Sequence, residues 1–133
     1  MNAKGTFEVK LNPQSDTDNP DATLGRITID KQFHGDLEGT SKGQMLTAGT
    51  AVNGSAGYVA MEKVTGKLHG LSGSFALQHN GIMTRGTPDL MITVVPDSGT
   101  DQLAGLRGNM TINITEGKHY YEFEYSIEQV KSE

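Results

Sequence analysis

Histidine and carboxylate side chains are the candidates for acid–base chemistry near neutral pH in this 133-residue chain, which contains no cysteine. The missing cysteines exclude thiolate nucleophiles, disulfides and cysteine-ligated zinc. The four histidines are far apart and show neither H-x-H nor H-x-x-x-H, the close spacings that direct two imidazoles at one metal: His34, His69, His79 and His119. We therefore expect no metal and no cofactor.

Glu62 and His79 are the two chemical side chains that the sequence brings together most clearly. Gly70 in the segment His69-Gly70-Leu71-Ser72 suits the first central position of a two-residue type II′ turn, where φ is positive. Continuing the register from that turn places Glu62 directly opposite His79. Opposed Cβ atoms lie about 4.5–5.5 Å apart, which allows a hydrogen bond between a carboxylate and an imidazole.

The same register decides which way this pair points. Glu62 and His79 share a face with Val64, Phe75 and Leu77, and that face is the more apolar of the two. We expect it to point inward. One reading of the pair is a structural cross-strand ion pair that fixes register, and the other is a group that serves a ligand or moves a proton.

The elements that position the pair are strands. Three segments alternate apolar and polar residues with the period of two that a half-buried strand requires. The first apolar residue of each alternating run is Phe7, Met110 or Tyr121. Weaker strand candidates, bounded by Gly, Pro, Asn or Asp, span 24–33, 36–49, 56–69, 72–82 and 89–95. No long stretch carries a helical stripe with a capping residue before it.

Eight short strands in succession predict an all-β fold, a closed eight-stranded antiparallel meander barrel formed by a single domain over residues 1–133. An open sandwich is the alternative. The interior of such a barrel is either filled by side chains or just wide enough for one small ligand.

The net charge and the hydropathy of the chain indicate which classes of binding partner are not expected. The net charge of −5 opposes binding to a phosphate backbone, so nucleic acid is not expected. No apolar run is long enough for a membrane span, and the N-terminal residues do not form a signal peptide, so we expect a cytoplasmic protein.

Two local motifs resemble functional sites, but we do not interpret either of them as one. Ser41 stands in a G-x-S-x-G match, but no helix follows it, and we interpret the match as chance in a chain with 17 glycines. Asp16, Asp18 and Asp21 crowd one loop, yet a calcium loop needs a ligand at position five and Gly at six, where Pro20 and Asp21 stand. We expect a solvated acidic loop.

Strand 89–95 predicts self-association. It carries Leu90, Ile92 and Val94 in one phase and Met91 and Val95 in the other, so neither face is polar, and no helix covers the outer one. A homodimer that pairs the same patch on two copies is the commonest solution.

Six short segments, in this order, carry a family resemblance: 35–39 (GDLEG), 58–66 (YVAMEKVTG), 73–79 (GSFALQH), 95–100 (VPDSGT), 103–106 (LAGL) and 119–121 (HYY). In these the chain resembles small uncharacterised bacterial proteins with a domain of unknown function. The resemblance implies a closed antiparallel barrel of the allene oxide cyclase kind and no established activity. We match no residue to the catalytic site of that cyclase, and fold does not imply function.

The leading hypothesis is a barrel that binds a small, partly apolar molecule in its lumen. A cofactor-free isomerase or cyclase that uses Glu62 or His79 as acid or base is the second, and a structural protein with a filled core and no ligand is the third. Whether the protein is an enzyme stays open. The candidates for lining the lumen are Glu62, His79, Tyr58, Phe75 and Glu38.

Overall fold

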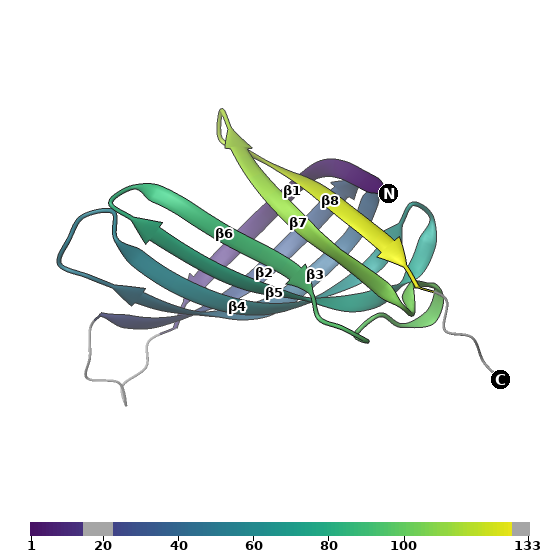
Figure 1. Ribbon diagram of the computed structural model, residues 1–133, viewed down its shortest axis with the longest axis horizontal. Coiled ribbons are helices and arrows are strands. Elements are labelled where there is room, and N and C mark those ends of the chain that lie inside the picture. The colour runs from purple at the N-terminus through teal and green to yellow at the C-terminus, as the bar shows by residue number, and fades with distance from the viewer. Residues whose placement is uncertain (15–22, 129–133) are drawn as a thin grey trace.

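The structure, a computed structural model that describes residues 1–14 and 23–128, is a closed barrel of eight antiparallel strands in chain order (Figure 1). This confirms the predicted all-β barrel. The strands, with one short 3-10 turn η1 (Asp101–Leu103) before β7, are β1 (Asn2–Pro13), β2 (Leu24–Gly35), β3 (Leu37–Gly49), β4 (Ala56–Leu68), β5 (Leu71–Thr84), β6 (Thr87–Val94), β7 (Leu106–Thr115) and β8 (Lys118–Ile127). Within the described ranges, no helix is long and apolar enough to cross a bilayer.

Three of the hairpins turn on two residues of which the second is glycine. Both central residues have positive φ in each case, at His69-Gly70, Arg85-Gly86 and Glu116-Gly117. This is the type I′ turn, whose twist matches that of the flanking strands. Glycine adopts such a backbone without steric cost, so the pattern X-Gly sets all three hairpins.

The predicted turn at Gly70 is therefore wrong by type, and the predicted register is wrong with it. Leu68 pairs with Leu71, which makes Leu77 the direct partner of Glu62 and Ala60 the direct partner of His79. The pairing has shifted by two residues, and a shift of two leaves every side chain on the same face. Glu62 and His79 consequently stay on one face, as diagonal neighbours.

Closure of the barrel is staggered. A path that steps from each residue to its direct partner on the next strand does not return to the residue where it began. Starting at Pro13 on β1, it comes back to β1 at Ala3, ten residues earlier. The partners along the path are Ile27, Met45, Ala60, His79, Ile92, Met110 and Phe123. Such a stagger requires strongly tilted strands. The weakest seam joins β6 and β7, where only Ile92–Met110 and Thr93–Asn109 pair among the described residues.

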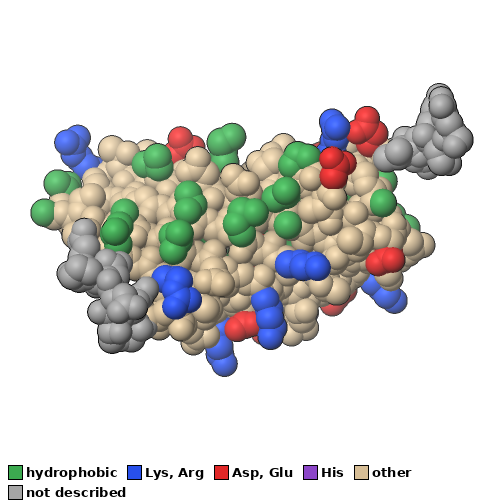
Figure 2. Space-filling view, turned by 90° about the horizontal axis from the view of Figure 1, so that it is seen from below, with side chains coloured by type: hydrophobic (Ala, Val, Ile, Leu, Met, Phe, Trp, Pro, Cys, Tyr) green, Lys and Arg blue, Asp and Glu red, His purple; other side chains and the backbone are tan. Residues whose placement is uncertain are grey.

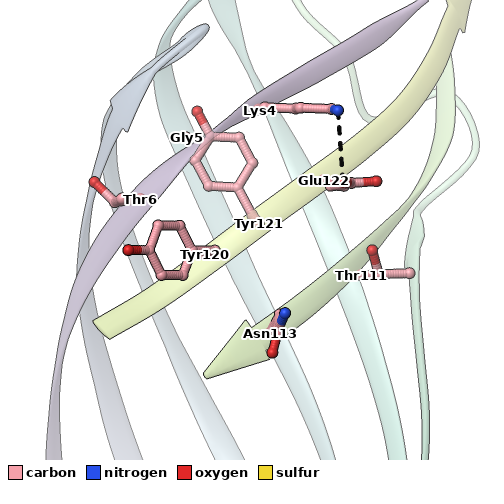
Figure 3. Close-up of a pocket in the computed structure, with 8 residues that line it drawn as sticks. All are labelled: Lys4, Gly5, Thr6, Thr111, Asn113, Tyr120, Tyr121 and Glu122. Carbon is pink, nitrogen blue, oxygen red and sulfur yellow. Dashed lines mark ion pairs between the residues drawn. The ribbon is translucent and has the colours of Figure 1, made fainter. Parts of the chain in front are cut away.

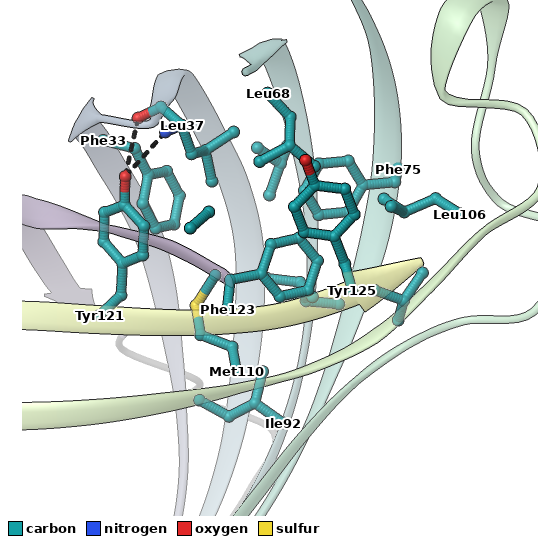
Figure 4. Packing of buried hydrophobic residues seen from close by; sticks show 14 of the residues in the cluster. Phe33, Leu37, Leu68, Phe75, Ile92, Leu106, Met110, Tyr121, Phe123 and Tyr125 are labelled. Carbon is teal, nitrogen blue, oxygen red and sulfur yellow. Dashed lines mark hydrogen bonds between the residues drawn. The ribbon is translucent and has the colours of Figure 1, made fainter. Parts of the chain in front are cut away.

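One half of the interior is packed solid (Figure 4). Phe75 stacks on Phe123 with ring centroids 5.9 Å apart, and Phe33 meets the edge of Tyr121 at 5.6 Å. The Tyr121 hydroxyl accepts a hydrogen bond from the Leu37 backbone N–H at 2.9 Å and donates to the His34 carbonyl at 2.9 Å. The side chains of this half are buried and packed against one another, and we call it the filled half.

Candidate functional site

Polar side chains replace apolar ones on the inner wall just beyond the filled half. Lys31 on β2, Ser41 on β3, Glu62 on β4 and His79 on β5 are all buried. The strand register aligns them on neighbouring inward positions, with Ser41 directly opposite Lys31. We call these four residues the polar cluster.

Glu62 is the centre of the polar cluster. Its Oε2 lies 2.8 Å from Lys31 Nζ and 3.3 Å from His79 Nε2, and the exposed fractions of the three side chains are 0%, 6% and 4%. Lys31 Nζ also lies 5.0 Å from the ring centre of Phe7, where a cation is attracted to the aromatic face. The ammonium is therefore held between a carboxylate and an aromatic wall.

Burial works against ionisation of Glu62, but the imidazole of His79 and the ammonium of Lys31 outweigh it, so the pKa of this carboxyl lies below its ordinary value. Glu62 is therefore a carboxylate near neutral pH. Although the ion-pair distances are short, neither Oε1 nor Oε2 of Glu62, nor His79 Nε2, has an aligned hydrogen bond to another described residue. The hydroxyl of Ser41 also lacks one. Buried polar groups without directed partners are uncommon, and each calls for an explanation such as a functional role or a bound water or ion.

Tyr58 lies between the polar cluster and the solvent. Its side chain is half-buried, its ring centre is 6.3 Å from that of His79, and burial followed by the charge of Glu62 raises the pKa of its phenol. The ring lies against Gly81, where an added Cβ would be 2.3 Å from Tyr58 Cε1. Gly81 thus allows the phenol ring to cover His79.

Beyond Tyr58 the described residues leave part of the inner wall exposed, and we call this part the open half of the barrel. Leu11, Met83, Leu90 and Ile114 belong to the inward-facing rows of their strands, yet their exposed fractions are 48%, 42%, 38% and 63%. In Figure 1, β6 and β7 diverge on this side, in agreement with their two-pair seam. We call these four residues the mouth.

The predicted lumen residues divide into three groups. Glu62, His79 and Tyr58 lie on the inner wall. Phe75 also points inward, but into the filled half. Glu38 is a correction: its side chain is 59% exposed on the outer face, where Oε1 accepts a hydrogen bond from the Gly35 backbone N–H at 2.8 Å. Its neighbour Leu37 is the inward residue, so alternation along β3 turns Glu38 outward.

Lys31 was missed by sequence reasoning. The signal was present, because Lys31 stands between Ile29 and Phe33 in the apolar phase of β2. A lysine at an inward position next to buried aromatic residues needs a counter-charge, and Glu62 supplies it.

The other motifs take no part in the polar cluster or the mouth, except Ser41. That residue lies in the middle of β3 with no helix behind it, so it is not a nucleophile elbow. His69 lies in the β4–β5 turn, where it contacts the Tyr125 hydroxyl and lies 3.5 Å from Asp36. No group of three or more metal-ligating side chains occurs in the described parts of the chain. Asp16, Asp18 and Asp21 lie outside them.

Exposed apolar side chains gather on the outside of the barrel. Leu46, Val59 and Met91 lie in one cross-strand row over β3–β6, and Met61 is the next outward residue on β4; all four are about half exposed. We call these four residues the outer patch. Figure 2 shows apolar side chains spread over this face.

A groove of about 620 Å³ crosses the outer surface of β1, β8 and β7 (Figure 3). The ion pair in it joins Lys4 and Glu122 at 3.7 Å, and both side chains are more than half exposed. Solvent screens such a pair, so it contributes little to stability.

Comparison with known proteins gives a family and a close structural neighbour. The model of a family of proteins of unknown function, DUF3224, matches residues 3–125. A crystal structure at 1.84 Å of a protein of unknown function from this family, from Shewanella oneidensis MR-1, shares 50% identity, covers 98% of each chain and superposes with a TM-score of 0.92. No curated protein matches the chain.

Proposed function

The chain belongs to the DUF3224 family, and we propose that it binds a small, partly apolar molecule in the open half of its barrel. The observation that supports this best is the mouth: four apolar side chains turn inward and yet stay exposed. A barrel without a ligand would gain stability by packing them, at about 25 cal/mol for each Å² buried. An apolar ligand covers the same surface.

The polar cluster gives the proposed ligand an orientation. The apolar body of the ligand lies against Leu90, Ile114 and Leu11, and its polar end points past Tyr58 towards Glu62 and His79. Tyr58 must turn aside for this contact, since its ring covers His79. Small-molecule sites generally combine apolar walls with a few convergent polar groups of this kind.

Proton transfer is the second candidate function. His79 turns Nε2 towards the Glu62 carboxylate at 3.3 Å, an arrangement that fixes the orientation of an imidazole. A substrate held at Tyr58 would then meet an imidazole suited to acid–base catalysis without a cofactor. The third hypothesis is a structural protein with a filled core and no ligand, and the packed cluster around Phe75 supports it for one half of the barrel.

Binding of 1-aminoanthracene, an uncharged fluorescent probe, tests the mouth. Leu90→Asp should weaken the binding of the probe at least tenfold, because a carboxylate then replaces an apolar side chain on the wall of the site. Met91→Asp is the matched control, since this neighbour on β6 points outward. No saturable binding to the wild type, or equal losses in the two variants, would contradict the proposal.

We also propose that a second copy of the chain covers the outer patch. Three of the polar residues beside the patch are amides, Gln44, Gln78 and Asn80, whose side chains both donate and accept. Apolar and amide groups can pair with their own kind across a two-fold axis, as a symmetric interface requires.

A further inference from the structure

We propose that the ligand of the open half buries an uncharged hydroxyl group, as an alcohol, phenol or enol, against the polar cluster. This rests on the lumen-binding function proposed above and names the chemical class of its ligand.

The charges of the polar cluster already balance. Lys31 Nζ and Glu62 Oε2 are 2.8 Å apart and shielded from water, so one positive and one negative charge compensate each other. A charged group on the ligand would lose its own hydration beside this pair without gaining a free counter-charge. The electrostatics therefore favour a neutral polar group over a carboxylate or an ammonium.

The open hydrogen-bonding positions specify a donor. The Glu62 carboxylate can only accept; its Oε2 already faces Lys31 Nζ at 2.8 Å and His79 Nε2 at 3.3 Å, whereas Oε1 has no hydrogen-bond partner among the described residues. A ketone or an ether has no proton to offer, so neither can meet this requirement. A hydroxyl can donate to Glu62, and its oxygen can accept a hydrogen bond from the Ser41 hydroxyl, which also lacks a directed partner.

Four compounds with one apolar body test the inference on the full chain by calorimetric titration: 1-naphthol, 1-methylnaphthalene, 1-naphthoate and 1-naphthylmethylammonium. We expect 1-naphthol to bind at least tenfold more tightly than each of the others. Equal or tighter binding of the naphthoate or the ammonium overturns the inference but leaves lumen binding intact. If none of the four binds, both proposals fail for ligands of this size.

Two substitutions make the charge argument sharper. Glu62→Gln leaves the Lys31 charge unbalanced, so the preference should shift at least tenfold towards 1-naphthoate. Lys31→Met leaves the Glu62 charge unbalanced, and the shift should favour 1-naphthylmethylammonium. Glu124→Gln, an exposed change on the outside of β8, should keep the wild-type order. If a variant unfolds, the order of the four compounds on the wild type decides alone, and unchanged orders in both folded variants refute the charge balance.

Discussion

Replacing Glu62 by Gln should cost about 3–5 kcal/mol of unfolding free energy, the usual loss when one partner of a buried ion pair is removed. Glu62 is fully buried and holds both Lys31, at 2.8 Å, and His79, at 3.3 Å. Gln fits the same space but carries no charge, so the Lys31 ammonium is left buried without a counter-ion. A domain with a typical stability of about 5–15 kcal/mol would lose a large part of it.

The measurement is urea unfolding followed by far-UV circular dichroism. Glu124→Gln makes the same chemical change on the exterior and should stay within about 0.5 kcal/mol of the wild type. The double variant Lys31→Met/Glu62→Leu should recover much of the loss, because removing both charges strands neither. A loss below about 1 kcal/mol for Glu62→Gln would refute the idea that this pair is buried and coupled.

Three further predictions follow from contacts described above. The pKa of Glu62 lies below its ordinary value of 4.5, so the stability that this carboxylate contributes is complete above pH 4.5 and is lost as the pH falls through the lower pKa of the folded protein. The difference in unfolding free energy between the wild type and Glu62→Gln should therefore become smaller in acid. A difference that becomes larger in acid would contradict this. Tyr121→Phe should cost about 1–3 kcal/mol in thermal unfolding, because the buried Leu37 N–H loses its acceptor, and an unchanged midpoint would show that this bond is dispensable. Light scattering of the wild type at micromolar concentration should give a mass of about twice the chain mass of 14.3 kDa, and the Met61→Lys variant should have the mass of a monomer. A wild-type mass of 14.3 kDa would contradict the proposed dimer.

The inward position of Glu62 and His79 could be predicted because it depends only on the alternation of side chains between the two faces of a strand. Each alternating run fixes which residues share a face, and an error of two residues at the Gly70 turn left those faces unchanged. The turn type itself could not be read from His69-Gly70, since glycine fits the first central position of one turn and the second of another. Direct partners, unlike faces, therefore had to come from the structure.

Long-range placement accounts for the remaining differences. Lys31 reaches Glu62 across β3, so no local pattern names it as the counter-charge, although its apolar phase on β2 indicates burial. Glu38 follows the buried Leu37 on β3, so the alternation of the strand places it outside the barrel, and the prediction that it lines the lumen is wrong. That one half of the barrel is filled and the other open depends on the stagger of all eight strands, which no single segment encodes.

The two-pair seam between β6 and β7 also bears on aggregation. Within the described residues, the first part of β6 has no partner strand on this side, and such edges recruit strands from other molecules. In a two-residue hairpin, Thr84 and Thr87 exchange the first hydrogen bonds, so the backbone of the next residue, Pro88, faces the unpaired side. Proline has no N–H to offer an incoming strand, and the charge of Asp89 follows it. The barrel can thus stay open beside its mouth while this edge resists growth into fibrils.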